Sequence, residues 1–325
     1  MHKNQNHFDV IIIGSGIGGL TSAAILARYN HKKVLVLEKH FQLGGLTHEF
    51  QRGKFRWDVG LHYVGGVAKG DFARAVFDYI TNSKLEWQKM PFIFEKFIYP
   101  DLKFDVPSDP IAYRKKLIEQ FPLEKFAIIQ YFKDIQAACS WQRLEILAKG
   151  LPTLFAKGLK ICNFRNNRLA RGTVGDYLDS HFKDKRLIAL LASQWGDYGL
   201  PPHQAAFAIH AIVVQYYLQG AYYPIGGASS IVKQVQPIIE NDGGRLLPNQ
   251  EVTDLIIEEG IVKGVKTRYA SYYAPIVISN MGAVETYHKL LKNHLPLPRD
   301  MNVLPNGLSA VTAYVGLKKI RKPWV

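Results

Sequence analysis

Cysteine is scarce in this sequence: only Cys139 and Cys162 occur among 325 residues, and they form no Cys-x-x-Cys pair. This scarcity excludes a disulfide-rich secreted scaffold and a thiol redox motif, and it predicts reduced structural thiols in a cytoplasmic setting. The eleven histidines are scattered, without an HExxH motif or a Cys/His cluster, so no metal site is predicted. Redox chemistry would therefore depend on an organic cofactor.

Long hydrophobic runs are also missing. The best candidate, residues 198–232, has no charged side chain, but Pro201, Pro202 and Pro224 bracket it. Its helical part, about residues 203–218, is shorter than the roughly 20 apolar residues that a membrane span needs. We interpret it as a buried helix beside an apolar pocket, with an ordinary core helix as the alternative. No apolar h-region precedes the first strand, which argues against a secretory signal.

Acidic residues are outnumbered, because 41 lysines and arginines face 27 acids and give a net charge of +14. Acidic partners must therefore be considered, but no RNP, zinc-finger or basic-helix pattern is present, and no nucleic acid partner is expected. In residues 140–171, seven cations accompany Glu145 alone, with leucines and phenylalanines between them. This pattern is typical of a segment that lies on an anionic membrane surface. A solvated helical face is the alternative.

The N-terminal segment has the pattern of a nucleotide-binding βαβ unit. An apolar run stops at Gly14, and a Gly14-x-Gly16-x-x-Gly19 turn leads into an alanine-rich helical pattern. Such glycines allow a tight turn, the approach of a pyrophosphate and close packing of the helix on the sheet. A second strand ends at Glu38, at roughly the spacing of 20 residues expected for an acid that binds a ribose hydroxyl. These features predict dinucleotide binding, and a βαβ corner without a ligand is the alternative.

A glycine pair, Gly44 and Gly45, follows this acid by six residues. The chain then stays rich in glycine and polar residues instead of continuing into another βα unit. A dinucleotide can approach such a loop closely because glycine has no Cβ, although a glycine-rich surface turn is the alternative. At this point the sequence resembles FAD-binding flavoproteins of the glutathione-reductase-like superfamily.

Within that superfamily the chain resembles the phytoene desaturase, carotenoid isomerase and retinol saturase family. WDVGLHYVGG, residues 57–66, is most similar to the retinol saturase branch, and the similarity extends over residues 222–265 and 274–287. Many amine oxidase relatives place an arginine after the glycine pair, where this chain has Leu46. Members of the family are longer, so the resemblance implies that the chain stops before the final part of the fold.

The resemblance implies an α/β fold in which a Rossmann-like FAD-binding domain carries an inserted α+β substrate domain. Residues 1–70 and 223–290 would form the two parts of the FAD domain, and residues 71–222 the substrate and membrane-facing domain. Residues 291–325 would begin a returning segment, with a substrate-domain strand in its alternating apolar stretch.

FAD is the implied cofactor. The residues expected to bind it are Gly14, Ser15, Gly16, Gly18, Gly19, Glu38, Lys39, Gly44, Gly45, Thr47, Gly60 and Val252, the last through its backbone near the adenine. His62 and Tyr63 are candidate catalytic residues beside the flavin. A purely structural role for His62 is the alternative, since histidine serves both roles.

The implied activity is that of an FAD-dependent oxidoreductase acting on carbon–carbon bonds of a hydrophobic isoprenoid, either a carotenoid or a retinoid. Saturation, desaturation and isomerisation share the same geometry of substrate and flavin, and GLHYVGG favours saturase-like chemistry. The sequence does not identify the electron donor or acceptor. The expected location is cytoplasmic, with peripheral membrane association.

Three alternatives remain. A non-catalytic prenyl-binding protein of the same fold would have a degraded glycine turn, and the turn here is intact. A nicotinamide-only dehydrogenase would be supported by a second GxGxxG motif, which the sequence lacks. An inactive fragment is the third.

Overall fold

The computed structural model describes residues 6–299, 301 and 309–317, and for residues 160–162 and 165 it describes the backbone alone. A four-stranded parallel sheet has the order β13-β1-β2-β9. β1 (Val10–Ile13) and β2 (Val34–Leu37) are buried along their whole length, as their unbroken apolar sequences predict. The outer strands β9 (Arg245–Leu247) and β13 (Ile276–Ser279) come from the C-terminal third of the chain. The fold is therefore α/β and Rossmann-like.

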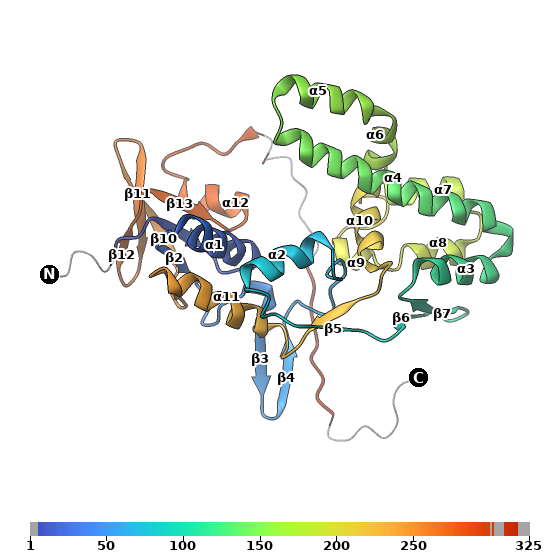
Figure 1. Ribbon diagram of the computed structural model, residues 1–325, viewed down its shortest axis with the longest axis horizontal. Helices are drawn as coiled ribbons and strands as arrows, with labels where there is room; N and C mark the ends of the chain where they lie inside the picture. Colours follow the sequence, from blue (N-terminus) through green and yellow to red (C-terminus); the bar gives the residue numbers. More distant parts are fainter. Residues whose placement is uncertain (1–5, 300, 302–308, 318–325) are drawn as a thin grey trace.

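Two helices cover one face of this sheet (Figure 1). α1 (Ile17–Asn30) begins directly after the glycine turn and ends at His31, which adopts the left-handed conformation. α11 (Ser229–Asn241) packs beside it and ends before Gly243 and Gly244, as the sequence predicts. The buried residues of α1 are small or aliphatic, which lets the helix lie close on the strands: Gly19, Leu20, Ala23, Ala24 and Ala27.

A three-stranded antiparallel sheet packs on the opposite face of the parallel sheet. It consists of β10 (Val252–Glu258), β11 (Ile261–Thr267) and β12 (Ser271–Tyr273). The turn between β10 and β11 has positive φ at both Glu259 and Gly260, 53° and 76°. Two left-handed residues match the twist of a hairpin, and the predicted hairpin at this position is confirmed.

The second part of the molecule is mainly helical and surrounds α4 (Lys125–Lys149), as Figure 1 shows. α10 (Phe207–Tyr217) packs against α4, and the Tyr131 hydroxyl lies 2.8 Å from Nε2 of His210 between the two helices. An antiparallel hairpin, β6 (Ile93–Ile98) and β7 (Lys103–Pro107), lies beside this helical core. The other helices are α3 (Pro110–Gln120), α5 (Thr153–Cys162), α6 (Phe164–Arg171), α7 (Val174–His181), α8 (Lys185–Leu191) and α9 (Trp195–Tyr198).

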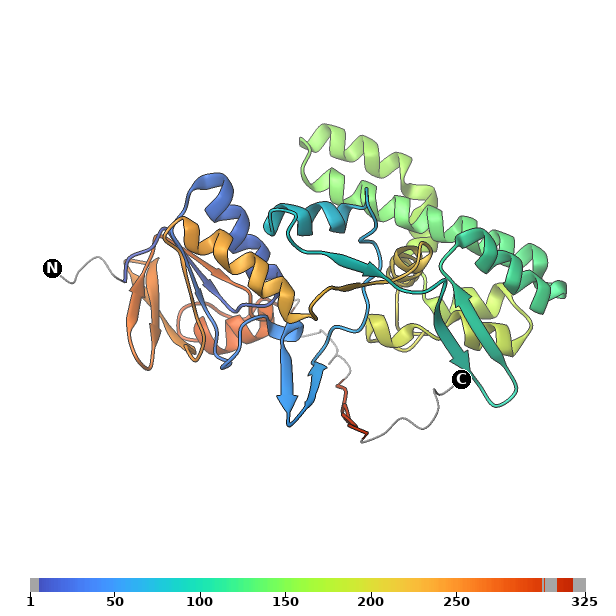
Figure 2. The same cartoon turned by 60° about the horizontal axis from the view of Figure 1, so that its bottom comes forward.

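The two parts are joined by paired segments of the chain. β5 (Trp87–Lys89) pairs antiparallel with β8 (Tyr222–Pro224), and Val64 forms a bridge with Tyr222. α2 (Phe72–Ile80) lies between these crossings along the chain. A hairpin of β3 (Glu49–Arg52) and β4 (Phe55–Asp58) projects from the sheet near this junction in both views (Figure 2). The predicted domain boundaries remain predictions.

Two expectations from the sequence are wrong. The helix expected from about residue 203 begins at Phe207, because Ala206 is extended and bridges Thr173. Residues 309–317 form no strand, and the rest of the stretch predicted to contain one, residues 307–308 and 318–325, lies outside the described residues. The Tyr314 ring packs edge-on against Phe50 of β3, 4.7 Å between centroids. The segment thus meets the β3–β4 hairpin through side chains, but it pairs with none of the strands that the structure describes.

Beyond β13 the described residues contain two short helical elements. α12 (Ala283–Glu285) continues into a π-helical turn, Thr286–Leu290. Throughout the described ranges, we find no helix with the combination of length and apolar character that would carry it across a membrane.

Candidate functional site

The glycine turn lies where the parallel strand β1 ends, at the crevice side of the sheet. Gly14 has φ of +98°, and a Cβ on Gly19 would lie 2.2 Å from the carbonyl oxygen of Gly14. These two positions therefore exclude side chains for reasons of the fold itself. No described side chain caps the start of α1 at Gly16, so its first amide groups are left for an anion, as a pyrophosphate would require.

Glu38 lies at the end of β2 and is held by the glycine turn. Its Oε2 accepts hydrogen bonds from the Ser15 backbone at 2.8 Å and from the Ser15 hydroxyl at 2.7 Å, and its Oε1 accepts one from the His40 backbone at 2.9 Å. Burial by itself raises the pKa of Glu38, but the hydrogen bonds from His40 and Ser15 outweigh it and lower the pKa overall. The carboxylate is therefore ionised and oriented at the edge of the crevice.

The glycine pair is bound to the same turn. The Gly44 backbone donates to Oγ of Ser15 at 2.9 Å. Gly45 has φ of +56°, and a Cβ there would lie 2.9 Å from Cα of Gly16. Gly45 must therefore lack a side chain so that its loop can contact the loop at Gly16. The two glycine loops lie together beside Glu38.

The remaining expected cofactor residues lie around this group. Thr47 donates from its hydroxyl to the Gly44 carbonyl at 2.8 Å, and the Gly60 backbone donates to the Leu46 carbonyl at 3.0 Å. Val252 is buried at the start of β10. Two residues before it, the backbone of Gln250 donates to the carbonyl of Glu38 at 2.7 Å, which brings this strand beside the acid.

Lys39 follows Glu38 and is exposed. None of the hydrogen bonds described above ties it to the glycine loops.

Asn280, just after β13, was not among the residues expected to bind the cofactor, although the sequence predicts that the strand ending at Ser279 and Asn280 faces the ligand crevice. Its backbone donates to the carbonyl of Ile13 at 2.8 Å. Its side chain lies over the glycine turn: a Cβ on Gly16 would be 3.2 Å from Asn280 Nδ2, and a Cβ on Gly18 2.8 Å from Oδ1. The position at the carboxyl end of a parallel strand was the available signal.

His62 and Tyr63 lie in a separate group on the loop that leads toward the helical part. His62 is exposed and Tyr63 is half-buried. The Tyr63 hydroxyl donates to Glu95 Oε2, which lies 3.5 Å from Gln194 Nε2. Burial, with the neighbouring carboxylate of Glu95, raises the pKa of Tyr63, so the phenol keeps its proton.

Asp197 on α9 belongs to the same group. Its side chain is exposed at one edge; desolvation of the rest and then the charge of Glu95 raise the pKa of its carboxyl, while His62 opposes this shift. Neither Glu95 nor Asp197 was found from the sequence, because both are distant from the motifs and only the fold brings them to His62 and Tyr63.

Two other carboxylates near the crevice have a structural role. Glu49 Oε1 accepts from the Ser229 backbone at 3.1 Å, and Asp58 Oδ1 accepts from the Ala228 backbone at 3.2 Å. Both amides lie at the start of α11, where negative charge is favourable.

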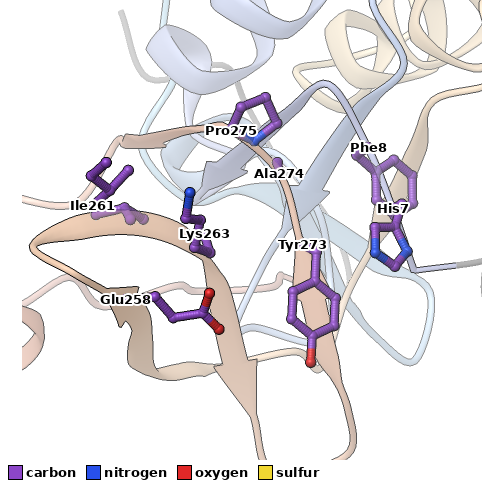
Figure 3. Close-up of a pocket in the computed structure, with 9 residues that line it drawn as sticks. His7, Phe8, Glu258, Ile261, Lys263, Tyr273, Ala274 and Pro275 are labelled. Atoms are coloured by element: carbon purple, nitrogen blue, oxygen red, sulfur yellow. The ribbon is translucent and has the colours of Figure 1, made fainter.

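The pocket in Figure 3 lies elsewhere. It has a volume of about 390 Å³ and is lined by residues of the β10–β11 hairpin, such as Glu258 and Lys263, and by residues that precede β1 and β13, among them His7, Phe8 and Pro275. These are the amino ends of the parallel strands, whereas nucleotides bind at the carboxyl ends. It is therefore not the dinucleotide crevice.

Comparison with known proteins supports the nucleotide fold. A family model described as an NAD(P)-binding Rossmann-like domain matches residues 12–80. An oxidoreductase from Methanosarcina mazei is similar in structure, with a TM-score of 0.61 and 20% sequence identity over 88% of this chain and 61% of that chain. At this level of identity the likeness shows a shared fold.

Curated relatives are similar over almost the whole chain. An all-trans-retinol 13,14-reductase of Danio rerio is 32% identical over 329 residues, which is 95% of this chain and 54% of that protein. A Danio rerio protein named inactive all-trans-retinol 13,14-reductase is 31% identical over 300 residues, 88% of this chain and 49% of that protein. Prolycopene isomerase 2 of Oncidium hybrid cultivar is 26% identical over 308 residues, 89% and 51% respectively.

The chain spans about half the length of the curated relatives it matches. The predicted resemblance is confirmed: this chain is a relative of the retinol saturases and, more distantly, of the carotenoid isomerases.

Proposed function

We propose that this protein is an FAD-dependent oxidoreductase that reduces a carbon–carbon double bond of a retinoid or related polyene. The observation that carries the proposal is the hydrogen-bond chain from Glu38 through Ser15 to Gly44, which joins the ribose acid, the glycine turn and the glycine pair into one crevice. The similarity to a retinol 13,14-reductase supports the class of substrate. The similarity to a protein named as inactive makes turnover itself the quantity to test.

The residues present fit FAD in this crevice. The uncapped amides at the start of α1 suit the pyrophosphate. Glu38 suits a ribose hydroxyl, and the backbone near Val252 suits the adenine. When bound, the flavin supplies transfer of a hydride equivalent to the polyene.

Reduction of a double bond also needs a proton for the neighbouring carbon. In our proposal the carboxyl of Asp197 and the imidazole of His62 hold this proton, and the Tyr63 hydroxyl orients Glu95 beside them. The raised pKa of Asp197 supports this role because it favours the protonated acid.

The proposed function includes an assignment of the two parts of the fold. We assign the parallel sheet with its flanking layers to the glutathione-reductase-like flavoprotein superfamily, and the helical part around α4 to an inserted substrate domain. The sheet supports this because it combines strands from residues 10–37 with strands from residues 245–279.

We also propose contact with an anionic membrane surface through the end of α4 and through α5 and α6. Leu154, Phe155 and Phe164 are 80%, 67% and 75% exposed there. Lys149 and Lys157 are exposed beside them along the chain, and apolar anchors among cations suit an anionic interface. Leu154→Asp with Phe155→Asp should lower cosedimentation with phosphatidylserine vesicles, and unchanged sedimentation would contradict this contact.

The first test of the oxidoreductase proposal is the visible absorption spectrum of the purified protein before and after denaturation. Flavin bands that are released on denaturation are the expected result. A protein that takes up no flavin, even after reconstitution, would sink the proposal.

The second test is turnover of all-trans-retinol with chemically reduced protein, followed by chromatography of the products. A dihydroretinol is expected, and His62→Ala should slow its formation while leaving the flavin content unchanged. Equal turnover by the variant would remove His62 from the mechanism.

A further inference from the structure

A cavity of about 810 Å³ lies between the helices α2, α4 and α10. Its volume is within the range of roughly 300 to 1,000 Å³ that is usual for small-molecule sites. None of the residues expected to bind the dinucleotide lines it. The cavity is thus a second space, separate from the crevice at the end of the parallel strands.

Two helix faces form most of its wall. On α4, the lining residues Gln136, Cys139, Arg143 and Ile146 recur at helical spacing, which places them on one face. This face extends over ten residues, or roughly 15 Å of helix. The sequence predicted an apolar pocket beside the second helix, α10. The residues of α10 that line the cavity are Ile212, Gln215 and Tyr216. They lie on a different face of the helix from His210.

One wall of the cavity is fixed to the loop that carries the candidate catalytic residues. The backbone of Gly66 donates to the carbonyl of Tyr216 at 3.0 Å. A Cβ on Gly65 would lie 2.6 Å from that carbonyl oxygen. Because Gly65 follows Tyr63 by two residues, a ligand against Tyr216 would extend toward the Tyr63 and His62 loop.

The lining combines apolar surface with hydrogen-bonding groups. Phe72, Ile146 and Tyr216 are 85%, 63% and 51% exposed, and together they give the cavity an apolar surface that a ligand could cover. Gln142 and Gln215 are half-buried. Neither amide makes a side-chain hydrogen bond to any residue that the structure describes, so both remain able to bind a ligand hydroxyl.

We propose that this cavity binds the isoprenoid alcohol substrate, with its chain against Ile212 and Tyr216 and its hydroxyl group on Gln142 and Gln215. This inference rests on the proposed function and adds the place and orientation of the substrate. The groove between the two helices is long enough for an extended chain, and its hydrogen-bonding side chains, which also include Gln136, Ser140 and Arg143, can receive one polar end.

The test is a fluorescence titration of the protein with all-trans-retinol. Ile212→Trp should weaken binding at least tenfold by filling the cavity. Ile129→Trp is the matched control, because Ile129 is also a half-buried isoleucine, lies on α4 and does not line this cavity; its affinity should change less than twofold. Equal affinities in the two folded variants would overturn the proposal.

The polar end has its own test. Gln142→Leu combined with Gln215→Leu should weaken binding of retinol severalfold and leave the binding of its methyl analogue, which lacks the hydroxyl, unchanged. An equal loss for both ligands would overturn the assigned orientation.

A third measurement uses a protein whose cavity lining is unchanged, so that misfolding of a cavity variant cannot explain the result. In a Cys162→Ser background, bound retinol should slow the modification of Cys139 by N-ethylmaleimide, because Cys139 lines the cavity. An unchanged rate at saturating retinol would contradict the proposed site. These binding tests do not need flavin. The proposed substrate site can therefore be contradicted while the flavin spectrum and turnover support the oxidoreductase proposal, and retinol can bind in the cavity of a protein that takes up no flavin.

Discussion

Ser15 donates two hydrogen bonds to one oxygen of Glu38, from its backbone at 2.8 Å and from its hydroxyl at 2.7 Å. Its hydroxyl oxygen also accepts from Gly44. Ser15, inside the GxGxxG turn, therefore links the acid to both glycine loops. It orients the acid from the second strand and holds the glycine pair against the first loop.

Glu38→Gln should weaken dinucleotide binding by ten- to a hundredfold, since hydrogen bonds to a charged group contribute about 1.5–3 kcal/mol. The amide removes the charge and places an NH₂ group near a carboxylate position that now accepts two hydrogen bonds. Equilibrium dialysis of reconstituted flavin checks this. Ser15→Ala should have a smaller effect because the backbone bond to the carboxylate remains, and equal losses would contradict the linking role of Ser15.

Gly45→Ala and Gly53→Ala form a matched pair, because both glycines have φ of +56°. Gly53 has no atom within 4 Å of its would-be Cβ, whereas Gly45 faces Gly16 at 2.9 Å. Gly53→Ala should lower the free energy of unfolding by about 1–2 kcal/mol through backbone strain alone. Gly45→Ala should lower it by roughly 1–3 kcal/mol more through steric overlap and should reduce the flavin content.

Urea unfolding of the two variants measures the difference. Equal destabilisation, with normal flavin content in both, would show that the two glycine loops are not in the close contact described above.

Tyr63→Phe removes the hydroxyl that donates to Glu95. Because this hydroxyl orients Glu95 beside the groups that hold the proton, turnover should fall by roughly ten- to a hundredfold, less than the full effect of losing a general acid, and flavin content should not change. Glu95→Gln should cause a loss of similar size, since it alters the same contact. The rate constant for reoxidation of reduced protein by substrate is the measurement. A loss in substrate affinity alone would show that Tyr63 positions the substrate and takes no part in the proton transfer.

His210 predicts how stability depends on pH. Burial lowers its pKa from 6.5 to about 4, so the unfolded chain binds a proton more readily than the folded protein between these values. Stability should therefore rise with pH from 4 to 6.5, by at most about 3 kcal/mol from this residue, and be lost as the pH falls. Urea unfolding at several pH values should show a flatter profile for His210→Gln.

The exposed His288 supplies the control. His288→Gln should keep the wild-type slope between pH 4 and 6.5. A wild-type slope in the His210 variant would place the titrating group elsewhere.

The nucleotide crevice could be predicted because local sequence determines it. Gly14 and Gly19 must lack a side chain for the turn to form, and Glu38 follows a buried strand at a fixed distance. The partners of Tyr63 could not be predicted in this way. Glu95 lies on β6 and Asp197 on α9, and no periodic pattern relates them to the loop.

The tail after residue 308 shows a second limit. Its alternating apolar residues predict a strand, but alternation specifies only the two faces of a strand. It does not specify a neighbour with which to form hydrogen bonds, and the described residues 309–317 pack side chains on the β3–β4 hairpin without pairing with a described strand.

The order of strands in the parallel sheet has a consequence for biosynthesis. β1 lies between β2 and β13, and Asn280 closes over the glycine turn. A ribosome must therefore add some 270 residues after the first strand begins before that strand gains its second neighbour. Contacts of such long sequence separation form slowly. A nascent chain that carries the complete glycine signature therefore still lacks the wall that Asn280 supplies, and under the proposed function the cofactor would bind late.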